Sequence, residues 1–227
     1  MNLKKNWWKI LAVICIINTI IGGLIFKVPR LPILNETIRN LYFHVPMWFG
    51  MIVILFVSLF YSIKYLSKSQ IKDDITAKEA ANTGILFGIL GLATGSLWAK
   101  FTWGAFWVGD PRTNGAAISI LIYMAYFVLR NSMDEEQKRA RISAVYNVFA
   151  YVMLIVFLIV YPRLNKVDSL HPGIGGNPGF SIYESELDGK MRMVFYPAII
   201  GWILLGVWMM SIRIRIENLK LKLDTPF

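Results

Sequence analysis

The 227-residue chain has only two histidines, and both lie outside its long apolar runs. His44 stands in the sequence Tyr-Phe-His-Val-Pro, directly before such a run, and His171 lies in a stretch of about thirty residues between two others. A neutral imidazole is a common metal ligand, and two imidazoles from opposite sides can supply the axial pair of an iron porphyrin. The alternative is that each histidine is a polar side chain at the edge of an apolar region.

A second group of chemically distinctive residues occupies positions 95–113. Its sequence is Gly-Ser-Leu-Trp-Ala-Lys-Phe-Thr-Trp-Gly-Ala-Phe-Trp-Val-Gly-Asp-Pro-Arg-Thr. Trp103 and Trp107 are four residues apart, so on a helix they would share a face and offer stacking area to a flat aromatic ligand. Lys100 and Arg112 could pair with carboxylates of that ligand. An aromatic belt at a membrane interface explains scattered tryptophans, but it does not explain this spacing followed by Asp-Pro-Arg.

The composition indicates which class of protein positions these residues. Hydrophobic residues make up 56% of the chain and charged residues 17%, whereas soluble domains carry about a quarter charged residues. The apolar excess is gathered in blocks, which excludes a soluble enzyme, a disordered chain and a secreted disulfide scaffold. The single cysteine, Cys15, permits no internal disulfide and no CxxC pair. The net charge of +10 is typical of the inside loops of a membrane protein and does not indicate nucleic-acid binding.

Runs of about 20 apolar residues cross the hydrocarbon core as helices. The sequence predicts six such spans, at about 7–26, 45–65, 82–100, 115–130, 143–162 and 193–212. We therefore expect an all-α polytopic membrane helical bundle that forms a single integral membrane domain over residues 1–227.

The distribution of lysine and arginine predicts the orientation. With the N-terminus inside, fifteen of the 24 basic residues fall in inside segments and nine in outside segments, which favours both termini in the cytoplasm. The inside segments 67–78 and 131–141 are then short, charged loops. The outside segments, about 27–46, 98–115 and 163–192, hold both histidines and the tryptophan-rich segment, so we expect the chemistry on the outer face.

The spans themselves carry few groups that suggest transport of ions. No Asp, Glu, Arg or His lies near the middle of any of them, although ion pathways through a membrane generally need such residues. The third span has glycines at positions 84, 88, 91 and 95, which lie on one helix face. We expect this face to pack against another helix of the same chain rather than against a partner subunit.

The tryptophan-rich segment resembles the signature of haem-handling membrane proteins. Within that superfamily the chain is most similar to the haem exporter protein C family of cytochrome c maturation. The similarity extends to Tyr-Phe-His-Val-Pro, to a histidine in the third outer loop and to six spans of this total length. Two positions depart from the family pattern: Gly109 stands where a tryptophan usually precedes the aspartate, and Pro172 follows the third-loop histidine in place of a polar residue.

The resemblance implies a function and a site. The protein would be a membrane haem-binding subunit in the bacterial inner membrane, not an enzyme, that presents haem b on the periplasmic face to a haem chaperone. An ATP-binding-cassette subunit and a second membrane subunit of the exporter would be its other partners. His44 and His171 would be the axial ligands of the iron. The residues implied to contact the haem plane are Trp98, Trp103, Trp107, Asp110 and Arg112.

Two other functions remain as alternatives. One is a cytochrome c synthase of the same superfamily, which attaches haem to thiols. Such synthases resemble longer chains with additional spans and further histidines, so six spans and two histidines favour the haem-binding subunit. The other is an unrelated multi-span solute transporter, which would need polar groups at mid-membrane that these spans lack.

Overall fold

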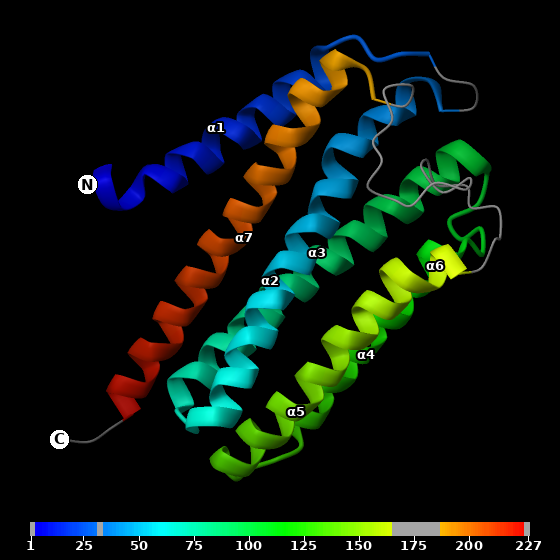
Figure 1. Ribbon diagram of the computed structural model, residues 1–227. Coiled ribbons are helices and arrows are strands. Elements are labelled where there is room, and N and C mark those ends of the chain that lie inside the picture. The colour runs from blue at the N-terminus through cyan, green and yellow to red at the C-terminus, as the bar shows by residue number, and fades with distance from the viewer. Residues whose placement is uncertain (1–2, 31–33, 165–186, 225–227) are drawn as a thin grey trace.

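The computed structural model describes residues 3–30, 34–164 and 187–224, and these ranges contain helices and turns but no strand (Figure 1). Six helical stretches are long and apolar enough to cross a membrane. The elements are α1 (Leu3–Ile25), the 3-10 helix η1 (Asn35–Asn40), α2 (Leu41–Lys68), α3 (Ile71–Trp103), α4 (Pro111–Asn131), α5 (Glu136–Ile155), the π-helical turn η2 (Val156–Val160), α6 (Tyr161–Leu164) and α7 (Gly189–Asp224). The predicted all-α, six-span architecture is confirmed.

The fifth span is built from three consecutive elements, because α5, η2 and α6 follow one another without a break. Every span is longer than the apolar run from which it was predicted. The largest differences lie at the start of α3, which begins at Ile71 and not near residue 82, and at the end of α7, which continues to Asp224 and does not end near residue 212. The extra turns carry charged side chains, which an apolar-run criterion assigns to loops.

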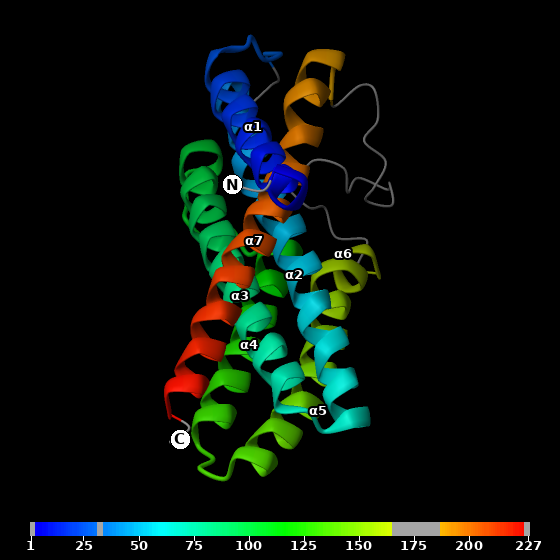
Figure 2. The same cartoon turned by 90° about the vertical axis from the view of Figure 1, so that its left-hand side faces the viewer.

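α2 and α3 form the middle of the bundle. α2 packs most extensively on α3 and also contacts α5 and α7, whereas α1 packs mainly on α7 and α4 packs on α5. In Figure 1, α1 and α7 therefore lie on one side of α2 and α3, with α4 and α5 on the other. Figure 2 views the bundle from the side of α1 and α7. Buried apolar side chains of α2, α3, α4 and α5 fill the centre, among them Leu55, Phe87, Tyr123 and Leu154.

The four glycines of α3 pack against another helix of the chain, as expected, and the structure shows that this helix is α2. A Cβ atom built on each glycine would lie under 3 Å from an α2 side chain. The pairs are Gly84 with Leu55, Gly88 with Met51, Gly91 with Trp48, and Gly95 with His44. The missing side chains thus let two long helices approach closely, and the last pair positions a histidine of interest.

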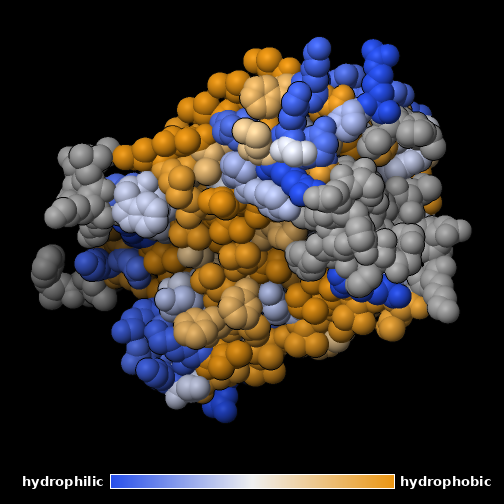
Figure 3. Space-filling view, turned by 45° about the horizontal axis from the view of Figure 1, so that its top comes forward, coloured by the Kyte–Doolittle hydropathy of each residue, from blue (hydrophilic) through white to orange (hydrophobic). Residues whose placement is uncertain are grey.

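The outer surface of the bundle suits a hydrocarbon environment. Large apolar side chains on all six spans are exposed, including Leu24, Phe60, Leu121, Val152 and Ile200. Figure 3 shows apolar residues over much of the surface, with hydrophilic residues gathered in groups. This pattern is typical of membrane-spanning helices, because lipid tails and not water surround their outer faces.

Ion pairs with buried carboxylates tie the helices together at the end where α3 begins. Asp73, Asp74 and Glu79 of α3 are buried. Each accepts a hydrogen bond from a different helix: Asp73 from Lys64 of α2, Asp74 from Arg130 of α4, and Glu79 from Arg213 of α7. The prediction that residues 67–78 form a plain charged loop is therefore wrong from Ile71 onward. Opposite charges that are distant in the sequence neutralise one another, which allows the helix to start earlier.

Replacing Asp74 by alanine should destabilise the bundle by about 3–5 kcal/mol, because the Arg130 guanidinium would remain buried without its carboxylate. In the native chain Arg130 Nη1 donates to Asp74 Oδ1 at 2.8 Å, and both side chains are 7% exposed. The measurement is thermal unfolding of the purified protein in detergent. Glu36→Gln is the matched control, since it breaks an exposed pair with Arg39 and should cost about 0–1 kcal/mol. Equal losses in the two variants would contradict this interpretation.

Candidate functional site

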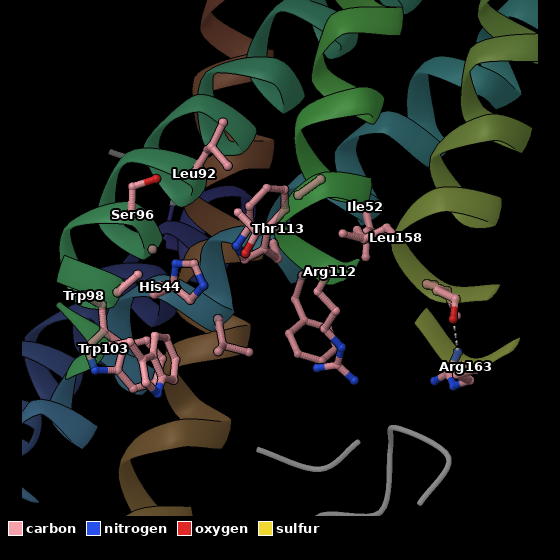
Figure 4. A pocket seen from close by; sticks show the side chains of 17 residues that line it. His44, Ile52, Leu92, Ser96, Trp98, Trp103, Arg112, Thr113, Leu158 and Arg163 are labelled. Carbon is pink, nitrogen blue, oxygen red and sulfur yellow. Dashed lines mark hydrogen bonds between the residues drawn. The ribbon is translucent and has the colours of Figure 1, made fainter. Parts of the chain in front are cut away.

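A cavity of about 180 Å³ lies near the start of α2 and the end of α3, at the opposite end of the bundle from the buried carboxylates (Figure 4). Side chains of α2, α3 and α4 and of the segment from η2 to α6 form its wall. Most of the wall is apolar. Its aromatic and polar members are His44, Trp48, Phe49, Ser96, Trp98, Trp103, Arg112, Thr113 and Arg163.

His44 is held from three sides at this cavity. Its imidazole makes edge-on contacts with Trp48 and Trp98, with ring centroids 6.1 Å apart in both cases. Its Nδ1 lies 3.3 Å from the Thr94 hydroxyl oxygen, within hydrogen-bond distance. A Cβ on Gly95 would lie 2.5 Å from His44 Cε1, so only glycine leaves room for the ring at this point. The histidine is therefore buried and fixed in orientation, unlike a polar side chain at a loose interface.

Trp98 and Trp103 form the aromatic wall beside the histidine. Both belong to the last turns of α3, and their ring centroids are 5.9 Å apart. Trp98 is 5% exposed and also contacts His44. The two indoles and the imidazole thus form one continuous aromatic surface, which suits contact with a flat apolar ligand.

The expectation that Trp103 and Trp107 share a helix face is wrong. α3 ends at Trp103 because Gly104 adopts a left-handed backbone conformation with φ of 83°. Trp107 lies beyond that break, is 46% exposed and donates from Nε1 to Asn114 Oδ1 at 3.1 Å. It does not line the cavity.

Gly109 also adopts a left-handed conformation, with φ of 70° and no atom within 4 Å of the position of a Cβ. A Cβ at this position would have space, but the backbone of a tryptophan there would be strained. The turn before Asp110 is therefore built around glycine in this chain.

Asp110 caps the N-terminus of α4 and sets the position of Arg112. Its Oδ1 accepts a hydrogen bond from the backbone N–H of Arg112 at 2.8 Å, and Pro111 occupies the first helical turn. This is a standard helix N-cap, in which the carboxylate satisfies an otherwise unpaired backbone donor. Asp110 is 4% exposed, whereas the side chain of Arg112 reaches the cavity. The aspartate thus acts through the arginine that it positions.

The basic residues at the cavity differ from those expected. Lys100 is not on the wall, because its Nζ donates to the carbonyl oxygen of Gly104 at 2.9 Å and lies over the Phe106 ring. Arg163 of α6 takes a place on the wall, and the sequence did not mark it as a site residue. The only feature of the sequence that could have indicated Arg163 is its position directly after the fifth predicted span, at the start of an outer segment.

The second candidate ligand, His171, lies outside the described residues. So does most of the predicted outer segment 163–192, of which residues 163–164 and 187–192 are described. The described part of the chain therefore brings together His44, Trp98, Trp103 and Arg112 at one cavity, with Asp110 behind them and Trp107 to one side.

Comparison with known proteins identifies the family. The family model described as Heme exporter protein C matches residues 1–226. The chain belongs to this family. Similar relatives carry the same name: the protein of Paracoccus denitrificans is 25% identical over 91% of this chain and 83% of its own length. The proteins of Haemophilus influenzae and Escherichia coli K12 are 25% and 24% identical, over 85% and 80% of this chain and 76% and 70% of theirs.

Membership of the haem exporter protein C family makes the chain a haem-handling, multi-pass membrane protein of cytochrome c maturation. The family is one of membrane subunits that work with other maturation components and not one of known enzymes. The expectation drawn from the tryptophan-rich segment and Tyr-Phe-His-Val-Pro is confirmed at this level.

Proposed function

We propose that the protein binds haem at the cavity between α2, α3 and α4 and presents it on the periplasmic face to a haem chaperone, for attachment to c-type cytochromes. The observation that carries this proposal is the convergence of one histidine, three tryptophans and two arginines on the wall of a single cavity. Imidazole supplies an iron ligand, indoles supply stacking area, and guanidinium groups supply partners for carboxylates. Haem b presents all three complementary features.

His44 is the axial ligand that the described residues offer. Because the Thr94 hydroxyl lies at Nδ1, the ring would coordinate iron through Nε2. A hydrogen bond to the non-ligating nitrogen fixes the ring and raises its basicity, as in other metal sites with histidine ligands. His171 remains the proposed second ligand on the strength of the family resemblance.

The size of the cavity suits a ligand of which only one edge is enclosed. Clefts that enclose organic ligands usually measure about 300–1,000 Å³, whereas this cavity measures about 180 Å³. A porphyrin bound here would project beyond the cavity, towards the side where Trp107 lies. Trp107 is thus proposed to contact the projecting part, and this partial enclosure suits a cargo that is passed on.

The proposed setting is the bacterial inner membrane, with both termini in the cytoplasm and the cavity on the periplasmic side. The support is the excess of lysine and arginine in the segments at the other end of the bundle. An ATP-binding-cassette subunit, a second membrane subunit and a periplasmic haem chaperone are the proposed partners, because exporters need an energy source and an acceptor for the cargo.

Reporter fusions test this orientation. A fusion after Ser69, between α2 and α3, should report the cytoplasm, and a fusion after Leu164, at the end of α6, should report the periplasm. The measurement is the activity of paired reporters that function on one side of the membrane only. Fusions that report the same side, or the reverse sides, would contradict the proposed face.

A substitution at Gly95 tests whether the orientation of His44 matters for haem. Gly95→Ala places a Cβ against Cε1 of the imidazole, so the ring must move. We expect a shifted Soret band and haem occupancy lowered by about 10-fold, the effect typical of disturbed metal-ligand geometry. Gly189→Ala is the matched control, because its Cβ meets no atom within 4 Å. A Gly95→Ala protein with the wild-type spectrum and occupancy would refute this role of His44.

A further inference from the structure

The fifth span reaches the cavity through a local change of helix type. Between α5 and α6 the chain forms the π-helical turn η2, Val156–Val160, which is wider than an α-helical turn. On the facing helix, Gly115 leaves space for it: a Cβ there would lie 2.1 Å from the carbonyl oxygen of Phe157. Single π turns inside α-helices occur frequently at functional sites. Here the turn places Leu158 and Ile159 on the cavity wall.

Arg163 follows this turn and is tied to it. Its Nη1 donates to the carbonyl oxygen of Ile159 at 3.0 Å, and the preceding Pro162 is buried. The hydrogen bond leaves other N–H groups of the guanidinium available, since arginine has five. The side chain borders the same cavity as His44 and Trp103, as Figure 4 shows.

Arg112 and Arg163 place two positive charges on one side of the cavity. They come from different helices, and each repels the other electrostatically. Over residues 3–30, 34–164 and 187–224, neither guanidinium lies within 4.0 Å of a carboxylate oxygen. Other basic residues of the bundle, such as Arg130 and Arg213, are paired with carboxylates. The Asp110 carboxylate offsets part of the Arg112 charge without contacting the guanidinium. Two guanidinium groups that lack a direct carboxylate partner, beside an apolar wall, favour an anionic ligand.

We propose that Arg163 and Arg112 together form a carboxylate clamp, so that the cavity selects a flat apolar ligand carrying two carboxylates along one edge. This inference rests on the proposed function, and it assigns the propionate edge of the porphyrin to the side of α4 and α6. The macrocycle lies against Trp98 and Trp103, and each guanidinium receives one carboxylate in bidentate fashion. Arg163 is thereby a determinant of ligand specificity and orientation.

The test uses metal-free protoporphyrin IX, which has both carboxylates but no iron for a histidine to bind. Binding to the full chain in lipid nanodiscs is measured by quenching of tryptophan fluorescence, beside the dimethyl ester of the same porphyrin. We expect Arg163→Gln to weaken binding of the free acid about 10-fold and to leave binding of the ester unchanged. Arg163→Lys should retain part of the preference for the acid, because it keeps the charge without the bidentate geometry.

Lys100→Gln is the matched control, because Lys100 is near the site but off the cavity wall. It should leave binding of both porphyrins unchanged. An Arg163→Gln protein that binds acid and ester like the wild type, or that loses affinity for both equally, would overturn the proposed clamp. Neither result would count against the proposed function, haem binding by the wild-type chain. A wild-type chain that binds neither porphyrin nor haem would instead overturn the proposed function.

Discussion

Replacing His44 by alanine is expected to shift the Soret band of bound haem and to lower haem occupancy by at least about 10-fold. The iron loses an axial nitrogen that the Trp48 and Trp98 contacts and the Thr94 hydroxyl hold in place. Burial of the apolar macrocycle retains part of the affinity, so binding should weaken without vanishing. The measurement is an absorbance titration of the purified variant with haem.

Two controls separate ligation from a general disturbance of the cavity. Free imidazole added to the His44→Ala protein should restore a spectrum closer to that of the wild type, because it can occupy the vacated volume and coordinate the iron. Thr94→Val, which removes only the hydroxyl near Nδ1, should produce a smaller loss. A His44→Ala protein with an unaltered Soret band and unaltered occupancy would exclude His44 as an axial ligand.

Trp103→Ala is expected to weaken haem binding by about 10- to 100-fold while the six-span fold persists. The substitution removes one of the two indoles of the aromatic wall, whose ring lies 5.9 Å from that of Trp98. Loss of one large buried aromatic contact corresponds to about 1.5–3 kcal/mol of binding free energy. Haem titration measures the affinity, and gel filtration with circular dichroism checks the fold.

Trp107→Ala is the matched control for Trp103→Ala. Both remove an indole from the same short segment, but Trp107 lies beyond the end of α3 and donates to Asn114, off the cavity wall. Its loss should weaken binding clearly less than the loss of Trp103. A larger effect at Trp107 would show that the macrocycle lies outside the cavity, against this account.

The spans of the bundle could be predicted from the sequence because lipid imposes a simple rule of length and apolarity. The ends of the spans could not, because they depend on which charges meet. Asp73 and Asp74 disfavour a membrane helix when read locally, but Lys64 and Arg130 from other helices neutralise them. Such pairing is a property of the tertiary fold and leaves no local pattern in the sequence.

The candidate site was predictable to the same extent. The cavity brings together His44, Trp98, Trp103 and Arg112. The last three lie in one continuous segment, and His44 lies in a short motif near the start of α2, so both groups could be recognised in the sequence. The prediction that Trp103 and Trp107 share a helix face failed, because the left-handed turn at Gly104 ends the helix between them. Arg163 was missed for a different reason.

Arg163 reaches the cavity only because η2 widens the fifth span opposite Gly115. A π turn has no strong signature in a single sequence, and the fit of η2 to a glycine on another helix has none at all. The role of Gly95 beside His44 could not be predicted from the sequence either, because the glycine spacing indicated only helix packing. Its further consequence, room for an imidazole, follows from the register between α2 and α3.

Titration of the purified wild-type chain with haem in nanodiscs, followed by absorbance, is the most direct test of haem binding at this cavity. We expect a saturable Soret band at one haem per chain, which weakens in Gly95→Ala and Trp103→Ala and persists in Gly189→Ala. A wild-type chain that takes up no haem when haem is supplied in excess, although the chain is folded and inserted, would contradict haem binding at this site.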